Sequence, residues 1–166
     1  SLLFDALGWE RPAFAHIPLI HGEDGAKLSK RHGALGVEAY RDDGFLPEAV
    51  FNYLLRLGWS HGDDEIISRE QAVEWFDLDG VGKSPARFDT DKLTSLNGHY
   101  IRHGDNQRLC KIILPVITEM LDGTIAKDTE TWLILGMDTL KERAKTILEL
   151  ADSAQIYAKT RPLNMD

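Results

Sequence analysis

The clearest pattern in the sequence is a stripe of apolar residues between Asp105 and Gly123. Their spacing of three and four residues places these side chains on one face of a helix, and that face needs apolar surface to pack against. Asp105 suits the N-cap, and Pro115 is expected to bend the helix. The stripe consists of Leu109, Ile112, Ile113, Val116, Ile117, Met120 and Leu121. The second half of the chain is therefore predicted to be helical.

Two helices are predicted upstream of this stripe. The segment from Pro47 to Gly58 follows helical spacing, since Pro47 suits a first turn and Gly58 suits a left-handed stop. A shorter helix is predicted from Ser68 to about Asp77, because the side chains of Ser68 and Gln71 can form a capping box.

Caps and glycines predict three further helices. Asp89 suits an N-cap, and Asn97 with Gly98 is expected to end the helix that Asp89 begins. The other two are predicted over 128–136 and 138–158. Near the amino terminus, the apolar run from Phe14 to Ile20 predicts a brief strand or extended segment, placed at a sheet edge by its proline. The expected fold class is thus mainly α.

Composition limits the ligands and the cellular location that we expect for the protein. The chain has 19 Lys and Arg against 27 Asp and Glu, a formal net charge of −8, so any nucleic-acid contact must come from a local basic patch. The single cysteine, Cys110, cannot form an internal disulfide, and no Cys/His cluster suggests zinc. No apolar run approaches the roughly 20 residues of a membrane span. These features favour a reducing, cytoplasmic location without membrane contact.

Trp59, Trp75 and Trp132 are interpreted as core anchors, because burial is the commoner role for tryptophan, and the six histidines lack the spacing of metal ligands. The chain opens at Ser1 without an initiator methionine, so we expect it to lie inside a longer protein.

A cationic, glycine-flanked segment carries the strongest chemical signal. Lys27, Lys30 and Arg31 lie between the glycines of the stretch from residue 21 to residue 36, with Ser29 among them. Cationic heads and accessible backbone amides on a mobile loop suit a phosphate ligand. A bare Lys-x-x-Lys-Arg match is, however, more often a solvated surface loop.

The context of this segment resembles a known family. Gly-Trp-Glu-Arg-Pro-Ala-Phe-Ala-His-Ile-Pro-Leu-Ile, followed by Gly-Ala-Lys-Leu-Ser-Lys-Arg, is similar to bacterial glutamyl-tRNA synthetases, and the loop resembles their form of the class I KMSKS signature. The similarity continues through Gly-Phe-Leu-Pro-Glu-Ala at 44–49, Leu-Gly-Trp-Ser at 57–60, and Phe88 to Ile101. Residues 105–166 match mainly by position.

The resemblance implies a reaction and its site residues. In that family, ATP and L-glutamate form a glutamyl adenylate, and the glutamyl group is then transferred to tRNA(Glu). The implied catalytic residues are Lys30, which would contact the ATP phosphates, and Lys27. Lys27, Ser29 and Arg31 would shape the loop, and the backbone around Ile20 and Leu28 would border the adenine. Mg²⁺ would accompany ATP in the complete enzyme, which is expected to be monomeric, and no metal bound by this chain is implied.

The resemblance also implies a division of the chain. Residues 1–37 would be the end of the catalytic nucleotide-binding domain with the KLSKR loop, residues 38–104 a helical stem-contact region, and residues 105–166 the helical start of the anticodon-binding domain. No His-Ile-Gly-His-like element occurs. The chain alone is therefore not expected to aminoacylate tRNA.

Four cations in the predicted stem-contact region are candidate contacts to the tRNA backbone. Phosphate binding needs only correctly placed positive charge. The candidates are Lys83, Arg87, Lys92 and Arg102. For each of them, a solvated side chain or an ion pair with a nearby aspartate is an equally good interpretation.

Two alternatives stay open. One is a non-catalytic tRNA-binding or protein-interaction module that kept this region of a synthetase. The other is a glutaminyl relative within the same enzyme class, although the Lys-Leu-Ser-Lys-Arg form and the following Gly-Phe-Leu-Pro-Glu favour the glutamyl type.

Overall fold

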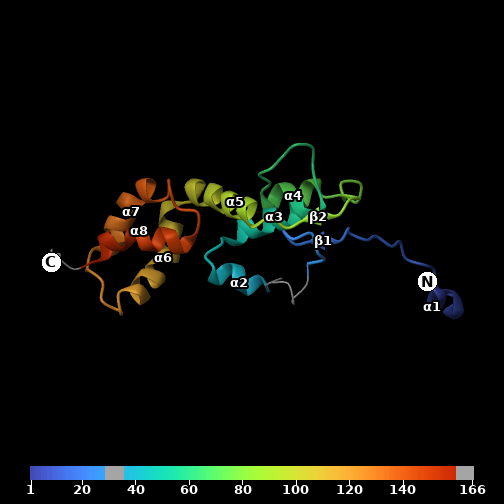
Figure 1. Cartoon of the computed structure of the whole chain (residues 1–166), viewed down its shortest axis with the longest axis horizontal. Helices are drawn as coiled ribbons and strands as arrows, with labels where there is room; N and C mark the ends of the chain where they lie inside the picture. Colours follow the sequence, from blue (N-terminus) through green and yellow to red (C-terminus); the bar gives the residue numbers. More distant parts are fainter. Residues whose placement is uncertain (29–35, 160–166) are drawn as a thin grey trace.

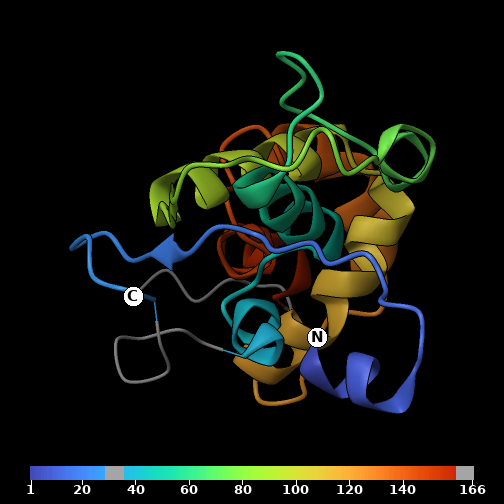
Figure 2. The same ribbon diagram turned by 90° about the vertical axis from the view of Figure 1, so that its right-hand side faces the viewer.

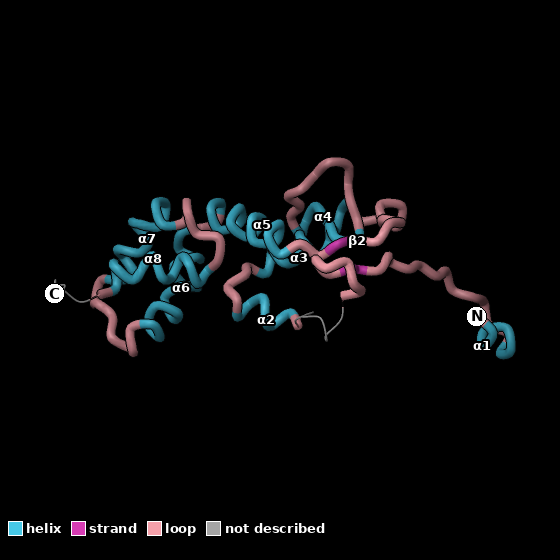
Figure 3. Tube along the Cα trace, viewed as in Figure 1, coloured by secondary structure: helices cyan, strands magenta, loops and turns pink. Residues whose placement is uncertain are grey.

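The computed structural model describes residues 1–28 and 36–159. This part is mainly helical and elongated, with α1 at one end and a bundle of α6, α7 and α8 at the other (Figure 1). The elements in chain order are α1 (Leu2–Leu7), β1 (Ile20–His21), α2 (Val37–Asp42), α3 (Pro47–Gly58), α4 (Arg69–Trp75), β2 (Ala86–Arg87), α5 (Thr90–His103), α6 (Asn106–Met120), α7 (Thr129–Leu140) and α8 (Ile147–Ala158). The prediction of a mainly α fold is confirmed for these residues (Figure 3).

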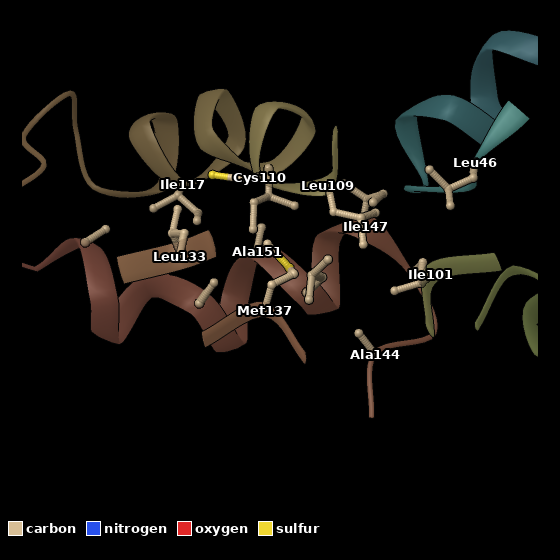
Figure 4. Close-up of a cluster of buried hydrophobic side chains, with 14 of the residues drawn as sticks. Leu46, Ile101, Leu109, Cys110, Ile117, Leu133, Met137, Ala144, Ile147 and Ala151 are labelled. Carbon is tan, nitrogen blue, oxygen red and sulfur yellow. The ribbon is translucent and has the colours of Figure 1, made fainter. Parts of the chain in front are cut away.

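The largest hydrophobic core lies in the bundle. Asp105 caps α6 by accepting a hydrogen bond from the Arg108 amide at 2.8 Å, and the predicted apolar stripe of α6 faces α7 and α8. Buried side chains from these three helices interlock in this core (Figure 4): Leu109, Cys110, Ile113, Ile117, Leu133, Met137, Ile147, Leu150, Ala151, Ala154 and Ala158.

The bundle core continues into the middle of the molecule. Leu46, which precedes α3, and Ala49 in its first turn belong to the same buried cluster, as does Ile101 near the end of α5. Leu46 is only 2% exposed. The buried cluster of the bundle therefore includes residues from α5 and from the start of α3.

A smaller core anchors α4. Trp59, Ile67 and Ala72 are buried together, with Trp75 partly buried against them, and Trp59 Nε1 donates to the carbonyl of Asp77 at 3.0 Å. Ser68 and Gln71 form the predicted capping box at the start of α4. Trp59 is thus the predicted core anchor, whereas Trp132 is 54% exposed and the prediction for that residue was wrong.

The predicted end of the helix at Asn97 and Gly98 was also wrong. Helix α5 continues to His103, and both residues are buried inside it. Ala144 and Lys145 pack against this part of α5: a Cβ atom on Gly98 would lie at an ordinary contact distance, 3.6 Å, from Ala144 O and from Lys145 Cα. Tertiary packing, rather than helix termination, explains this Asn-Gly pair.

The break between the last two helices lies later than predicted. α7 runs through Gly136 to Leu140, and Gly136 packs against the ring of Tyr157, where a Cβ atom would clash at 2.7 Å. The new helix begins after Thr146, whose hydroxyl accepts from the Glu149 amide at 3.2 Å.

Smaller differences concern the first half of the chain. α3 ends at Gly58 as predicted, but the next residue, Trp59, is extended with φ −143°, so no left-handed stop occurs. α1 and α2 were not predicted. The run from Phe14 to Ile20 forms a regular strand only at its end, in β1.

The amino-terminal segment buries little apolar surface. α1 contains no buried residue, and Trp9 and Phe14 are 63% and 71% exposed. Figure 2 shows this segment (blue) crossing in front of the other elements. Within the described residues, no helix has both the length and the apolar character needed to cross a bilayer.

An ion pair joins α3 to α6 and should make stability depend on pH. Burial by itself would raise the pKa of Glu48, but hydrogen bonds from Arg108 (Nη2 to Oε2, 2.9 Å) and from the backbone outweigh it, so this pKa is lowered. A lowered folded-state pKa stabilises the fold above the unfolded-state pKa of about 4.3, and the contribution is lost as pH falls through the folded-state value.

Glu48→Gln should therefore cost less than about 1 kcal/mol at pH 7, since both side chains are partly exposed. The difference in unfolding free energy between wild type and variant should shrink as the pH falls below about 4.3. A difference that is the same above and below this pH would contradict this account.

Candidate functional site

Residues 20–28, which begin with β1, form a tight hairpin that carries Lys27. Leu28 N–H donates to Ile20 O at 2.9 Å, Gly22 N–H donates to Ala26 O at 2.8 Å, and His21 and Lys27 form an antiparallel bridge. Ile20 and Leu28 are half-buried, whereas Lys27 is exposed. This part of the predicted loop is therefore held by backbone hydrogen bonds and presents the Lys27 ammonium group to solvent.

The hairpin rests on the start of α5. β1 pairs in parallel with β2, with Ile20 opposite Ala86 and His21 opposite Arg87. The Phe88 amide donates to His21 O at 2.8 Å, and the Thr90 amide donates to Glu23 Oε1 at 3.3 Å. The position of Lys27 is therefore linked to α5.

A basic groove lies between α3 and α5. It has a volume of about 320 Å³ and includes Arg56 from α3 and Lys92, His99 and Arg102 from α5 among its lining residues. Among the described residues, Glu65 is the one acidic residue that lines it, and its Oε1 lies 3.6 Å from Lys92 Nζ. In a chain of net charge −8, this is a local concentration of positive charge.

The pKa of the histidine in the groove is lowered by burial and by nearby positive charge. Partial burial lowers the pKa of His99, and the nearby His103 and Arg102 lower it further. The rings of His99 and His103 stack with centroids 4.2 Å apart. Burial is the larger cause of this lowered pKa, and the neighbouring positive charge adds to it.

Buried hydrogen bonds fix the two helices that form the groove. Tyr53 Oη on α3 accepts from the amide of Asp89, the N-cap of α5, at 2.6 Å. Asn52 Oδ1 accepts from Tyr100 Oη on α5 at 2.8 Å. The groove therefore has walls of fixed spacing.

The comparisons with known proteins decide the family. Residues 1–95 match the family described as tRNA synthetases class I (E and Q), catalytic domain. The chain belongs to this family.

The curated relatives that match this chain are glutamate–tRNA ligases. The chain is 65% identical to glutamate–tRNA ligase 2 of Paramagnetospirillum magneticum over 99% of its own length, and 61% identical to glutamate–tRNA ligase 2 of Rhodospirillum rubrum, again over 99%. It spans 34% and 35% of these two relatives, about a third of their length.

A solved synthetase shares the fold. The crystal structure of a glutamate tRNA ligase from Elizabethkingia meningosepticum, in complex with its amino acid, matches 97% of this chain with a TM-score of 0.78 and 28% sequence identity. The match covers 35% of that structure. The helical fold with its small parallel sheet is thus similar to part of a glutamyl-tRNA synthetase.

The structure separates the four predicted tRNA contacts. Lys92 and Arg102 lie together in the basic groove. Arg87 lies in β2 beside the hairpin, where its Nη2 is 3.4 Å from the position of a Cβ atom on Gly25. Lys83 lines a different cavity, of about 530 Å³, formed with residues 15–18 and with the segment after α4.

The groove also contains two residues that the sequence did not single out, Arg56 and His99. Arg56 is one of several polar residues on the helix from Pro47, and no local signal relates it to α5. Only the packing of α3 against α5 reveals its role in the groove.

Several predicted site residues cannot be placed. Ser29, Lys30 and Arg31 lie outside the described residues. Among residues 1–28 and 36–159, no group of three or more His, Cys, Asp or Glu side chains is arranged to hold a metal ion.

Proposed function

We propose that this chain is one part of a glutamate–tRNA ligase, which uses ATP to join L-glutamate to tRNA(Glu) through a glutamyl adenylate. The observation that carries the proposal is identity of 61–65% over 99% of the chain to two proteins of that name. Because the chain spans about a third of their length, the activity is proposed for the full-length protein and not for this chain alone.

The segment 27–31 would serve the adenylation step. When the glutamate carboxylate attacks the α-phosphorus of ATP, pyrophosphate leaves and negative charge grows on its oxygens. Lys30, together with Lys27, would stabilise that charge, and a preorganised cation is worth several kcal/mol in such a step. Ser29 and Arg31 would shape the loop, and the half-buried Ile20 and Leu28 would border the adenine.

Mg²⁺ would enter with ATP. The described residues offer no acidic or histidine cluster to hold a metal by themselves, whereas the phosphates of a nucleotide are usual Mg²⁺ ligands. In this proposal Mg²⁺ neutralises phosphate charge, and the residues of this chain contribute the lysine contacts.

The basic groove would bind the tRNA backbone. Arg56, Lys92 and Arg102 line one groove of fixed walls, which suits phosphates that pass between α3 and α5. In this scheme residues 38–104 form the stem-contact region, and residues 105–166 begin the anticodon-binding domain. We further propose that the parent enzyme is cytoplasmic and monomeric.

The exposed apolar side chains of the amino-terminal segment fit the same proposal. Patches of this kind commonly mark an interaction surface. Leu2, Trp9 and Phe14, which are 82%, 63% and 71% exposed, would pack against the remainder of the catalytic domain in the full-length protein.

An aminoacylation assay tests the proposed function. The full-length protein should attach radiolabelled glutamate to tRNA(Glu) when ATP is present, and should not attach glutamine. The 166-residue chain should show no charging in the same assay. Charging with glutamine alone would support a glutaminyl enzyme, and absence of charging with either amino acid would support a non-catalytic RNA-binding or protein-binding module.

Charge reversal tests the groove. The double variant Lys92→Glu, Arg102→Glu should weaken tRNA binding by roughly tenfold or more near 0.1 M salt, and should reduce the salt dependence of log Kd by about two. Filter binding across a salt series gives both values. The control Arg69→Glu changes the same kind of charge on α4, outside the groove, and should bind nearly as wild type. An equal loss of tRNA affinity in the double variant and in the Arg69→Glu control would argue against a specific groove.

A further inference from the structure

A buried amide side chain joins the middle of the molecule to the bundle. Asn97 on α5 is fully buried, and its Oδ1 accepts from the Leu46 amide at 2.7 Å. Its Nδ2 donates to Lys145 O, in the turn between α7 and α8, at 2.6 Å. A longer contact of 3.4 Å links Nδ2 to Gly44 O. One side chain therefore holds the α2–α3 turn and the α7–α8 turn against α5.

Gly44 makes a second contact between the two turns. The hydrogen bonds of Asn97 and Gly44 together are called the joint below. The Ile147 amide, at the start of α8, donates to Gly44 O at 2.8 Å. Gly44 has φ +83°, and a Cβ atom there would lie only 3.0 Å from the amide nitrogen of Leu148. Both the backbone conformation and the available space therefore require glycine.

This joint lies between two parts of the molecule that the proposed function assigns to one ligand. On one side, α5 carries Lys92 and Arg102 of the basic groove and supports the hairpin of Lys27. On the other side lies the bundle α6–α8, which Figure 1 shows at the far end of the molecule. Asn97 thus lies where α5 meets both turns, between the groove and the bundle.

We propose that Asn97 is a positioning residue for tRNA: it sets the placement of the bundle relative to the basic groove, so that one rigid RNA fits both. The inference rests on the proposed function, in which tRNA contacts both parts. ATP differs, because Lys27, its proposed contact among the described residues, lies on the groove side of the joint. Loss of the joint should therefore affect use of tRNA and leave use of ATP unchanged.

Steady-state aminoacylation by the full-length protein tests this inference. Asn97→Ala removes the side-chain hydrogen bonds of the joint, and Gly44→Ala disturbs the same joint while the Asn97 side chain itself is kept. Each variant should raise KM for tRNA by about tenfold, because a small misplacement between two contact regions weakens binding of a rigid ligand. KM for ATP should stay within about twofold of the wild-type value.

Leu133→Ala is the matched control, because it removes a fully buried side chain from the bundle core and leaves every hydrogen bond of the joint in place. Melting temperatures should show that it destabilises the protein, while its KM for tRNA stays near that of wild type.

If wild type charges glutamate, three outcomes would overturn the inference. The first is an unchanged KM for tRNA in both joint variants, and the second is a rise in KM for ATP as large as the rise in KM for tRNA. The third is a rise in KM for tRNA in Leu133→Ala as large as that in the joint variants. If wild type charges no glutamate at all, the proposed function fails, and this inference fails with it. The wild-type arm thus distinguishes the two kinds of failure.

Discussion

Replacing Lys30 with alanine in the full-length protein should slow glutamate-dependent ATP–pyrophosphate exchange by about 10²–10³-fold. The expected loss is large because the ammonium group would act mainly on charge that develops as pyrophosphate leaves, so its removal lowers kcat more than it raises KM for ATP. Initial rates of labelled pyrophosphate incorporation into ATP, measured over a range of ATP concentrations, separate the two parameters.

A lysine elsewhere supplies the control for this prediction. Lys127 is exposed in the turn before α7, so Lys127→Ala removes the same charge at a distance from the hairpin and should exchange pyrophosphate at nearly the wild-type rate. If Lys30→Ala retained exchange within about threefold of wild type, the transition-state role given to Lys30 would be untenable.

Leu46→Ala should produce the largest change in stability, about 2–5 kcal/mol. Leu46 is 2% exposed and lies in the cluster that unites α3 and α5 with the bundle, so its truncation leaves a cavity where these parts meet. Urea unfolding followed by helical circular dichroism measures the loss. Because one core spans the junction, the variant should shift the unfolding of α3, α5 and the bundle together.

Leu54→Ala is the matched control for this second prediction. Leu54 lies on α3, the helix that Leu46 precedes, but is 43% exposed, so the same truncation should cost less than about 1 kcal/mol. Similar costs at Leu46 and Leu54 would mean that the core does not continue from the bundle into α3.

Local signals predicted the helices whose ends are set by nearby residues. Pro47, the Ser68–Gln71 capping box and Asp105 act through the first turn of their own helices, and each begins a helix where the sequence indicates. The apolar stripe after Asp105 likewise predicted the buried face of α6. These features depend on residues three or four positions apart, which a sequence displays directly.

Features set by distant residues could not be predicted in this way. Asn97 and Gly98 look like a helix end, but hydrogen bonds and close packing with residues 144–145 keep them inside α5. The pairing of β1 with β2 joins residues more than sixty positions apart, and only two residues of each strand take part. The groove depends on α3 packing against α5, which places Arg56 and Arg102 in the lining of one cavity.

The chemistry of the candidate site followed a similar division. The motif predicted Lys27 as a site residue, and the structure adds that a hairpin presents its side chain to solvent. The grouping of Lys92 with Arg102, apart from Lys83 and Arg87, is a property of the folded chain.

A structure of the full-length protein with a non-hydrolysable ATP analogue tests the central claim most directly. The distance to measure is that from the Nζ atoms of Lys27 and Lys30 to the nearest phosphate oxygens. We expect at least one of them to lie within about 3 Å, as in a charge-assisted hydrogen bond. A triphosphate bound elsewhere, with both lysines facing away from it, would contradict the account.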